Sequence, residues 1–99
     1  MYTKKEVIKK LLPIFKEHPI KKAILFGSYA KGNQTKISDI DLLIDSNGQI
    51  QGIDFFGILE EINSVFDVQV DLLESSQIIK GSKVYKEIQK SGVVIYECA

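Results

Sequence analysis

The chain has 99 residues, which is enough for one domain spanning residues 1–99 and too few for two. Hydrophobic residues make up 44% of it, but no apolar run reaches the ~20 residues that cross a bilayer, so we expect no membrane partner. Thirteen lysines balance thirteen acidic residues, and a neutral chain without arginine lacks the basic surface of a nucleic-acid-binding protein.

The N-terminal quarter of the chain predicts an amphipathic helix followed by a buried strand. Thr3 and Glu6 fit a capping box, and the apolar residues after them recur three and four positions apart. Pro13 falls inside this pattern, so we expect the helix to kink or to end early, near Leu12. The apolar run at 22–26 stops at a glycine, which predicts a buried strand closed by a turn.

The next segment predicts a short helical turn, a loop and a second strand. Residues 27–32 predict a tight turn that leads into one or two helical turns, and the polar residues 33–38 predict a loop. Residues 39–45 alternate apolar and acidic side chains. This alternation predicts a strand with Asp39, Asp41 and Leu43 on one face and Ile40, Leu42 and Ile44 on the other.

The second half of the chain predicts two more helices and two more strands. We expect Asp54 to cap a helix whose apolar side chains continue to Phe66. A third strand is predicted over 67–73, a helix over 82–90 and a closing strand over 93–96. Strands interleaved with helices predict an α/β (α+β) fold, with a mixed sheet of about four strands flanked by helices.

The termini favour a cytoplasmic protein. The N-terminus is charged and amphipathic, unlike a secretory leader, and the lone Cys98 excludes an internal disulfide and a thiolate metal cage. A domain of this size buries only ~60–65% of the surface of its unfolded chain. A partner or a homo- or hetero-oligomer would therefore add to its stability.

The central part of the chain concentrates negative charge. Residues 1–36 carry a net charge of +7, whereas residues 37–74 contain nine acids and no base. Asp39 and Asp41 are two positions apart in a strand, where aspartate is rare and like charges repel. A divalent cation would relieve this repulsion, and carboxylate oxygens favour Mg²⁺ or Mn²⁺. Asp71 on the third strand can join the same site if the two strands are neighbours.

The glycine-serine turn before these acids adds an anion site. Gly27 lets the backbone approach a ligand closely, Ser28 offers a hydroxyl, and the start of a short helix offers unpaired amides. An anion site beside a cation site suits a metal-bound triphosphate. The alternative for the aspartates alone, and for the acidic segment as a whole, is a solvated face that binds nothing.

These motifs resemble a known family. The sequence FGSYAKG at 26–32, ten residues after Gly27-Ser28, and then Asp39-Ile40-Asp41 resemble the signature of the minimal nucleotidyltransferases of the DNA polymerase β superfamily. Asp71, between a valine and a leucine, matches the third carboxylate of that family. The resemblance covers nearly the whole chain and implies the nucleotidyltransferase (polymerase β palm-like) fold.

The resemblance also implies roles for individual residues. Asp39, Asp41 and Asp71 would bind Mg²⁺, with two ions expected, and Asp71 would accept a proton from the attacking hydroxyl. Gly27 and Ser28 would hold the phosphates of ATP.

Three lysines are candidates to neutralise the departing charge of the nucleotide. Lys31 is placed there by the motif, whereas Lys80 and Lys83 have no motif to place them. Many members of the family carry arginine at the positions of Tyr29 and Lys31, and lysine lacks the bidentate fork of arginine.

The resemblance suggests an acceptor as well. Stand-alone members act as antitoxins that transfer AMP from ATP to a tyrosine of a HEPN-domain ribonuclease toxin, which would make this chain a protein adenylyltransferase. The alternative is a binding module that neutralises the same partner by occlusion and makes little use of its active site. Retention of the three aspartates and of Gly27-Ser28 favours the enzyme, because occlusion needs none of them.

The remaining aromatic and titratable residues predict structural positions. We expect His18 on the surface rather than at a metal, and Phe55, Phe56 and Phe66 in the core. Tyr29 is expected to be exposed, where it could stack on a nucleobase.

Overall fold

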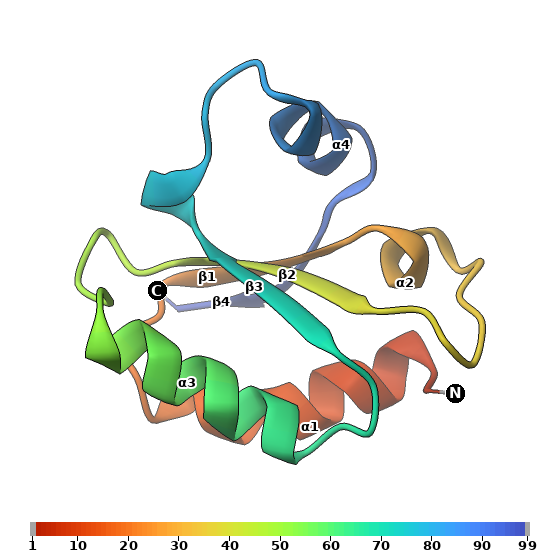
Figure 1. Ribbon diagram of the computed structural model, residues 1–99, viewed down its shortest axis with the longest axis horizontal. Helices are drawn as coiled ribbons and strands as arrows, with labels where there is room; N and C mark the ends of the chain where they lie inside the picture. Colours follow the sequence, from red (N-terminus) through yellow and green to blue (C-terminus); the bar gives the residue numbers. More distant parts are fainter. Residues whose placement is uncertain (1, 99) are drawn as a thin grey trace.

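A computed structural model describes residues 2–98 and contains one mixed sheet with helices on both faces (Figure 1). The order of the strands is β3-β2-β1-β4. Strand β1 is antiparallel to both β2 and β4, whereas β2 and β3 are parallel. The predicted fold class is therefore confirmed. The strands are β1 (Lys22–Phe26), β2 (Ile40–Asp45), β3 (Val70–Glu74) and β4 (Val93–Glu97).

Two helices lie side by side on one face of the sheet and a third lies on the opposite face (Figure 1). Helices α1 (Lys4–Lys16) and α3 (Ile53–Ser64) share the first face, and α4 (Lys83–Ser91) covers the second. The parallel pairing of β2 with β3 requires a crossover, which α3 supplies. Short helical turns follow β1 (α2, Ser28–Lys31) and β3 (η1, Ser75–Gln77). Across residues 2–98, the helices are too short or too polar to span a membrane.

Helix α1 begins at the predicted capping box but extends further than predicted. The Thr3 side chain accepts a hydrogen bond from the Glu6 amide, and the Glu6 side chain accepts one from the Thr3 amide. The expected early end near Leu12 is wrong, because the helix continues through Pro13 to Lys16. Pro13 is exposed, so water can bond the carbonyl that it leaves unpaired, while buried residues on the other side of the helix hold it to the sheet.

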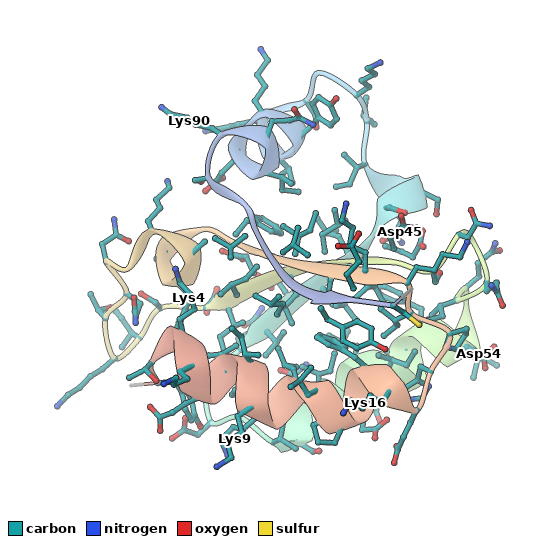
Figure 2. All side chains as sticks on the ribbon, turned by 180° about the vertical axis from the view of Figure 1, so that it is seen from behind. Lys4, Lys9, Lys16, Asp45, Asp54 and Lys90 are labelled. Atoms are coloured by element: carbon teal, nitrogen blue, oxygen red, sulfur yellow. The ribbon has the colours of Figure 1, made fainter. Side chains whose placement is uncertain are left out.

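The core lies between the sheet and the α1–α3 layer. Lys9 of α1 points away from it into solvent, and Lys90 of α4 projects from the other side of the molecule (Figure 2). None of the residues of α4 is buried, so this helix packs more loosely than α1 and α3. The largest fully buried side chains include Tyr29, Phe15, Leu11, Leu25, Ile40, Leu42 and Ile44.

Two expectations for α3 are wrong. The helix begins at Ile53 after Gly52, which makes no side-chain cap, and Asp54 lies within its first turn rather than at its cap. Phe56 is 60% exposed because it lies on the outer face of the helix, whereas Phe66 is buried as predicted. Phe55 is half-buried against the core.

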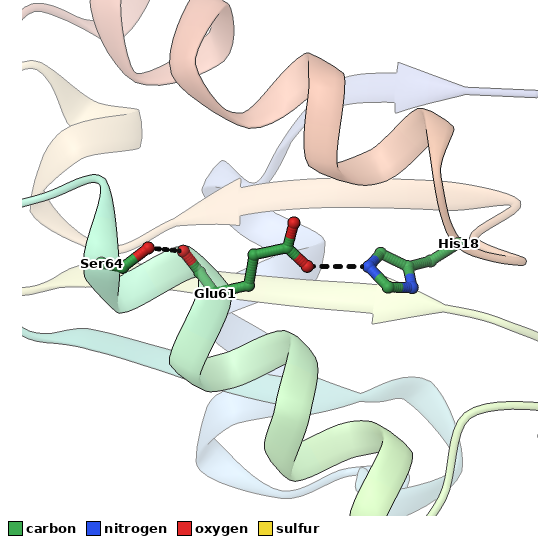
Figure 3. Close-up of polar contacts among 3 residues, drawn as sticks. All are labelled: His18, Glu61 and Ser64. Carbon is green, nitrogen blue, oxygen red and sulfur yellow. Dashed lines mark hydrogen bonds and ion pairs between the residues drawn. The ribbon is translucent and has the colours of Figure 1, made fainter.

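A polar contact joins the loop after α1 to α3. The His18 Nε2 atom lies 2.9 Å from Oε1 of Glu61 (Figure 3). The Ser64 hydroxyl donates a hydrogen bond to the Glu61 carbonyl one turn along the helix. The His18 side chain is 27% exposed, so it lies at the surface as expected, with a carboxylate partner.

Candidate active site

Asp41 and Asp71 are brought together by the pairing of β2 with β3. The two residues are direct partners in the parallel register. Partners in such a register project from the same face of the sheet. Leu43, two residues after Asp41, lines a cavity together with Tyr85 and Ile88 of α4. Both carboxylates therefore project from the face that α4 covers.

Asp39 is positioned by the loop that leads into β2. The Thr35 amide donates a hydrogen bond to the Ser38 hydroxyl over 2.8 Å, and the Ser38 amide donates one back to the Thr35 carbonyl. This turn delivers the chain to Ile40, whose amide bonds the Gln69 carbonyl at 2.9 Å. Asp39 lies exposed, one residue before the strand begins.

Gly27 packs against the Asp41 carboxylate. Its backbone has φ 73° and ψ −153°, a conformation that L side chains rarely adopt. A Cβ added to Gly27 would collide with Oδ2 of Asp41 and would lie 3.1 Å from its Cγ. Ser28, half-buried, begins α2 immediately after this bend. The glycine thus allows the backbone and the carboxylate to occupy neighbouring positions.

Burial and the neighbouring acidic groups raise the pKa of Asp41 to about 6. Burial is the largest cause, followed by the negative charge of Asp71 and a hydrogen bond with it, and then by the charges of Asp39 and Glu87. A bound cation would favour the ionised form of this carboxyl. Because the surrounding donors are carboxylate oxygens, the residues present fit a hard divalent ion such as Mg²⁺.

The three aspartates are not the tightest acidic group in residues 2–98. The only three ligand-bearing side chains in this part of the chain whose ligand atoms all lie within 4.8 Å of one another belong to Glu17, His18 and Glu61. The oxygens of Asp39, Asp41 and Asp71 are more widely spaced. The structure thus pairs Asp41 with Asp71 and leaves Asp39 just before the start of β2.

A cavity of about 610 Å³ extends from the two paired aspartates. Its size falls within the range of small-molecule and cofactor sites. The floor near Asp41 is Phe26, the register partner of Asp41 in β1, and Val84 contributes from α4. The cavity thus combines acidic side chains, which can bind a cation carried by a ligand, with apolar side chains, which can contact a flat apolar part of that ligand.

Two polar residues of this region were not predicted from the sequence. The Gln69 side-chain amide donates a hydrogen bond to Oδ1 of Asp71 over 3.0 Å. The Glu87 carboxylate lies 3.6 Å from Nζ of Lys31. Gln69 could have been found, since it is two residues before Asp71, whereas nothing in the sequence connects α4 with the Gly27-Ser28 turn.

The lysine candidates differ in position. Lys31 ends α2, so its side chain starts one helical turn after Gly27. Lys80 lies at the edge of the cavity beneath α4, among Ile24 and Ile78, and is exposed. Lys83 is the first residue of α4 and is exposed as well.

Tyr29 points into the core, so the expectation that it is exposed is wrong. Its side chain is fully buried, and its hydroxyl has no hydrogen-bond partner among the residues that the structure describes. The single turn of α2 directs Tyr29 and Ala30 inward because both help to cover the sheet. Tyr29 is therefore not placed to stack on a nucleobase.

Comparison with known proteins places the chain in a family. The Polymerase beta, Nucleotidyltransferase family model matches residues 9–98. A Methanocaldococcus jannaschii protein named as a protein adenylyltransferase is 34% identical over 73 residues, which cover 74% of this chain and 78% of that protein. A second protein of that organism, also named as a protein adenylyltransferase, is 33% identical over 88 residues, which cover 88% of this chain and 85% of that protein.

Solved structures share the fold. The crystal structure of a toxin-antitoxin with AMP-PNP has a TM-score of 0.76 at 22% identity, and the match covers 92% of this chain and 73% of that one. A chain of the structure described as a tri-AMPylated Shewanella oneidensis HEPN toxin in complex with MNT antitoxin has a TM-score of 0.72 at 18% identity. That match covers 97% of this chain and 74% of the other. The family match, the relatives and the shared fold agree, and the chain belongs to the polymerase beta nucleotidyltransferase family.

Proposed function

We propose that this protein is a Mg²⁺-dependent antitoxin that transfers AMP from ATP to a tyrosine hydroxyl of a HEPN-type toxin. The register pairing of Asp41 with Asp71, beside the Gly27-Ser28 bend, is the observation that carries the proposal. Relatives named as protein adenylyltransferases support the group transferred. Structures of the same fold described as toxin-antitoxin complexes support the kind of partner.

The acidic residues would hold the metal and manage the proton. Asp39, Asp41 and Asp71 supply the oxygen donors for two Mg²⁺ ions, which when bound neutralise phosphate charge and favour ionisation of the acceptor hydroxyl. Asp71 also accepts the proton that the hydroxyl loses. The raised pKa of Asp41 supports this assignment, since the site is built to favour a nearby cation.

The bend and α2 would hold the phosphates. Gly27 brings backbone amides close to the β- and γ-phosphates, the Ser28 hydroxyl donates to them, and Lys31 balances their charge. The acceptor oxygen forms a bond to the α-phosphorus as the bond from that phosphorus to the β-phosphate bridging oxygen breaks. Pyrophosphate leaves with the electron pair, and AMP remains on the acceptor.

A second molecule would present the acceptor. Within residues 2–98, the segments that connect the strands and helices are short, so the described residues leave little to form a second substrate lobe. A tyrosine on a bound partner can reach a cavity that opens beside β3, the edge strand of the sheet. The phosphates would occupy the side near Gly27 and leave the α-phosphorus facing the partner.

Transfer of radiolabel tests the proposal. The chain is mixed with a HEPN-type partner toxin, Mg²⁺ and ATP labelled at the α-phosphate, and the partner is analysed for label on tyrosine. We expect labelling by the wild type and by Asp54→Asn, an exposed aspartate of α3, and none by Asp39→Asn combined with Asp41→Asn. An unlabelled partner that is nevertheless inhibited, also by the double variant, would establish neutralisation by occlusion.

A further inference from the structure

We propose that Glu87 is a positioning residue of the active site, which holds Lys31 in the nucleotide-free chain and competes with the triphosphate for it. This inference rests on the function proposed above. The carboxylate comes from α4, an element far along the chain from the motif that supplies Lys31. The sequence motif of the active site does not include Glu87.

The position of Lys31 is fixed relative to the phosphate-binding bend. The Lys31 amide donates a hydrogen bond to the Gly27 carbonyl over 3.2 Å, which closes the single turn of α2. The Lys31 side chain therefore starts from a defined point beside Gly27. Its Nζ lies 3.6 Å from Oε1 of Glu87, with the two side chains 47% and 35% exposed. Lys31 is thus paired with a carboxylate of the same chain, beside the bend where the phosphates of the nucleotide would bind.

Glu87 also belongs to the charge environment of the aspartates. It contributes to the negative potential at Asp41, together with Asp71 from β3 and Asp39 from the preceding loop. Among the described residues, Lys31 is the cation that contacts this acidic group through an ion pair. The negative charge of Glu87 repels an incoming triphosphate, whereas the positive charge of Lys31 attracts it. The strength of both interactions therefore changes when the ion pair opens.

The ion pair is weak enough to exchange. Half-exposed ion pairs at this separation contribute little to stability, because water screens them and both side chains lose freedom when they pair. A triphosphate carries several charges and can replace one carboxylate as the partner of Lys31. Helix α4 has no buried residue and covers a cavity of about 270 Å³ beside Ile24 and Leu43, so its packing opposes a small adjustment only weakly.

Binding of AMP-PNP in the presence of Mg²⁺ tests the role of Glu87 without turnover. Affinities are measured by NMR titration, which follows binding into the millimolar range, and folding of each variant is checked by its thermal transition. We expect Glu87→Gln to bind about two- to five-fold more tightly than the wild type, as the loss of one weak competing ion pair predicts. Glu60→Gln, which removes the same charge from the exposed side of α3, should bind as the wild type does.

A second background separates the route through Lys31 from direct repulsion. We expect Lys31→Gln to bind AMP-PNP more weakly, and in that background the additional change Glu87→Gln should give a smaller gain than it gives in the wild type, because it relieves direct repulsion alone. Weaker or unchanged binding by Glu87→Gln alone would overturn the inference and leave the proposed function standing. An equal gain in both backgrounds would overturn the competition for Lys31. If neither the wild type nor Glu87→Gln binds AMP-PNP, the proposed function fails and this inference with it.

Discussion

Gly27 and Asp41 share a space that admits no further carbon atom, since a Cβ on Gly27 would collide with Oδ2 of Asp41. The φ of 73° at Gly27 adds backbone strain for any other residue. We therefore expect Gly27→Ala to lower the free energy of unfolding by roughly 1–3 kcal/mol and to weaken Mg²⁺-dependent AMP-PNP binding at least about tenfold. Urea denaturation and calorimetric titration measure the two effects.

Gly57 provides the matched control for this substitution. It lies within α3, and a Cβ built on it meets nothing within 4 Å among the described residues. Gly57→Ala should raise stability by about 0.5–1 kcal/mol, because alanine is the better helix former, and should leave AMP-PNP binding unchanged. Equal behaviour of the two alanine variants would show that the contact between Gly27 and Asp41 does not shape the site.

Glu74 is a buried carboxylate with a structural role. Its two oxygens accept hydrogen bonds from the Ser46 amide, the Ser46 hydroxyl and the Ser76 amide. Burial raises its pKa, but the hydrogen bonds from Ser76 and Ser46 together outweigh burial and hold the pKa at about 2. Because the pKa is lower than in the unfolded chain, the ionised group stabilises the fold above about pH 4.5, and this stabilisation is lost as the pH falls toward 2.

The corresponding variant is Glu74→Gln. An amide cannot accept at both ends, so one donor loses its partner, and we expect a loss of roughly 2–3 kcal/mol at pH 7. Denaturation with urea between pH 7 and pH 2.5 should show the difference from the wild type shrinking below pH 4.5. The exposed Glu60→Gln should change stability by less than about 0.5 kcal/mol. A pH-independent difference would contradict the electrostatic account of Glu74.

Pro13 weakens a helix that forms in spite of it. Pro13→Ala restores an amide to the interior of α1, and we expect it to raise the free energy of unfolding by roughly 1–3 kcal/mol. Pro19 lies outside the helix, so Pro19→Ala should instead lower stability slightly, by freeing the unfolded chain. Urea denaturation of both variants checks the contrast. No gain from Pro13→Ala would indicate that the helix is already relaxed around the proline.

Local patterns predicted most of the fold. The strand at 22–26, the glycine-serine turn and the capping box each depend on residues close together in the sequence, and the structure reproduces all three. The alternation around Asp41 and Asp71 indicated which face each occupies. Their placement as direct register partners required β3 to lie beside β2, which depends on the crossover through α3 and not on either strand alone.

Features that depend on tertiary packing could not be predicted. The burial of Tyr29 follows from the way α2 covers the sheet, and the exposure of Phe56 follows from the orientation of α3. Glu87 reaches Lys31 across 56 positions of sequence because α4 folds back over the sheet. The sequence around neither residue predicts that contact.

Asp41 connects stability with the proposed chemistry. Its folded-state pKa of about 6 lies above the ordinary value of 3.8, so the unfolded chain releases this proton more readily and ionisation of Asp41 destabilises the fold. The cost is absent below about pH 3.8, grows as the pH rises toward 6 and is complete above it. In the absence of divalent cations, we therefore expect Asp41→Asn to be more stable than the wild type at pH 7, by about 1–2 kcal/mol after allowance for solvent screening.

Denaturation with urea at pH 7 and at pH 3.5, with and without Mg²⁺, measures this contrast. The advantage of Asp41→Asn should disappear at pH 3.5, where the wild-type carboxyl is protonated too. Added Mg²⁺ at pH 7 should stabilise the wild type and not the variant, because only the wild type offers the carboxylate. Asp39→Asn, at an exposed position, should change the metal-free stability by less than about 0.5 kcal/mol. An Asp41→Asn variant less stable than the wild type without metal would mean that the Asp41 charge is already compensated, and the electrostatic case for a cation would fail.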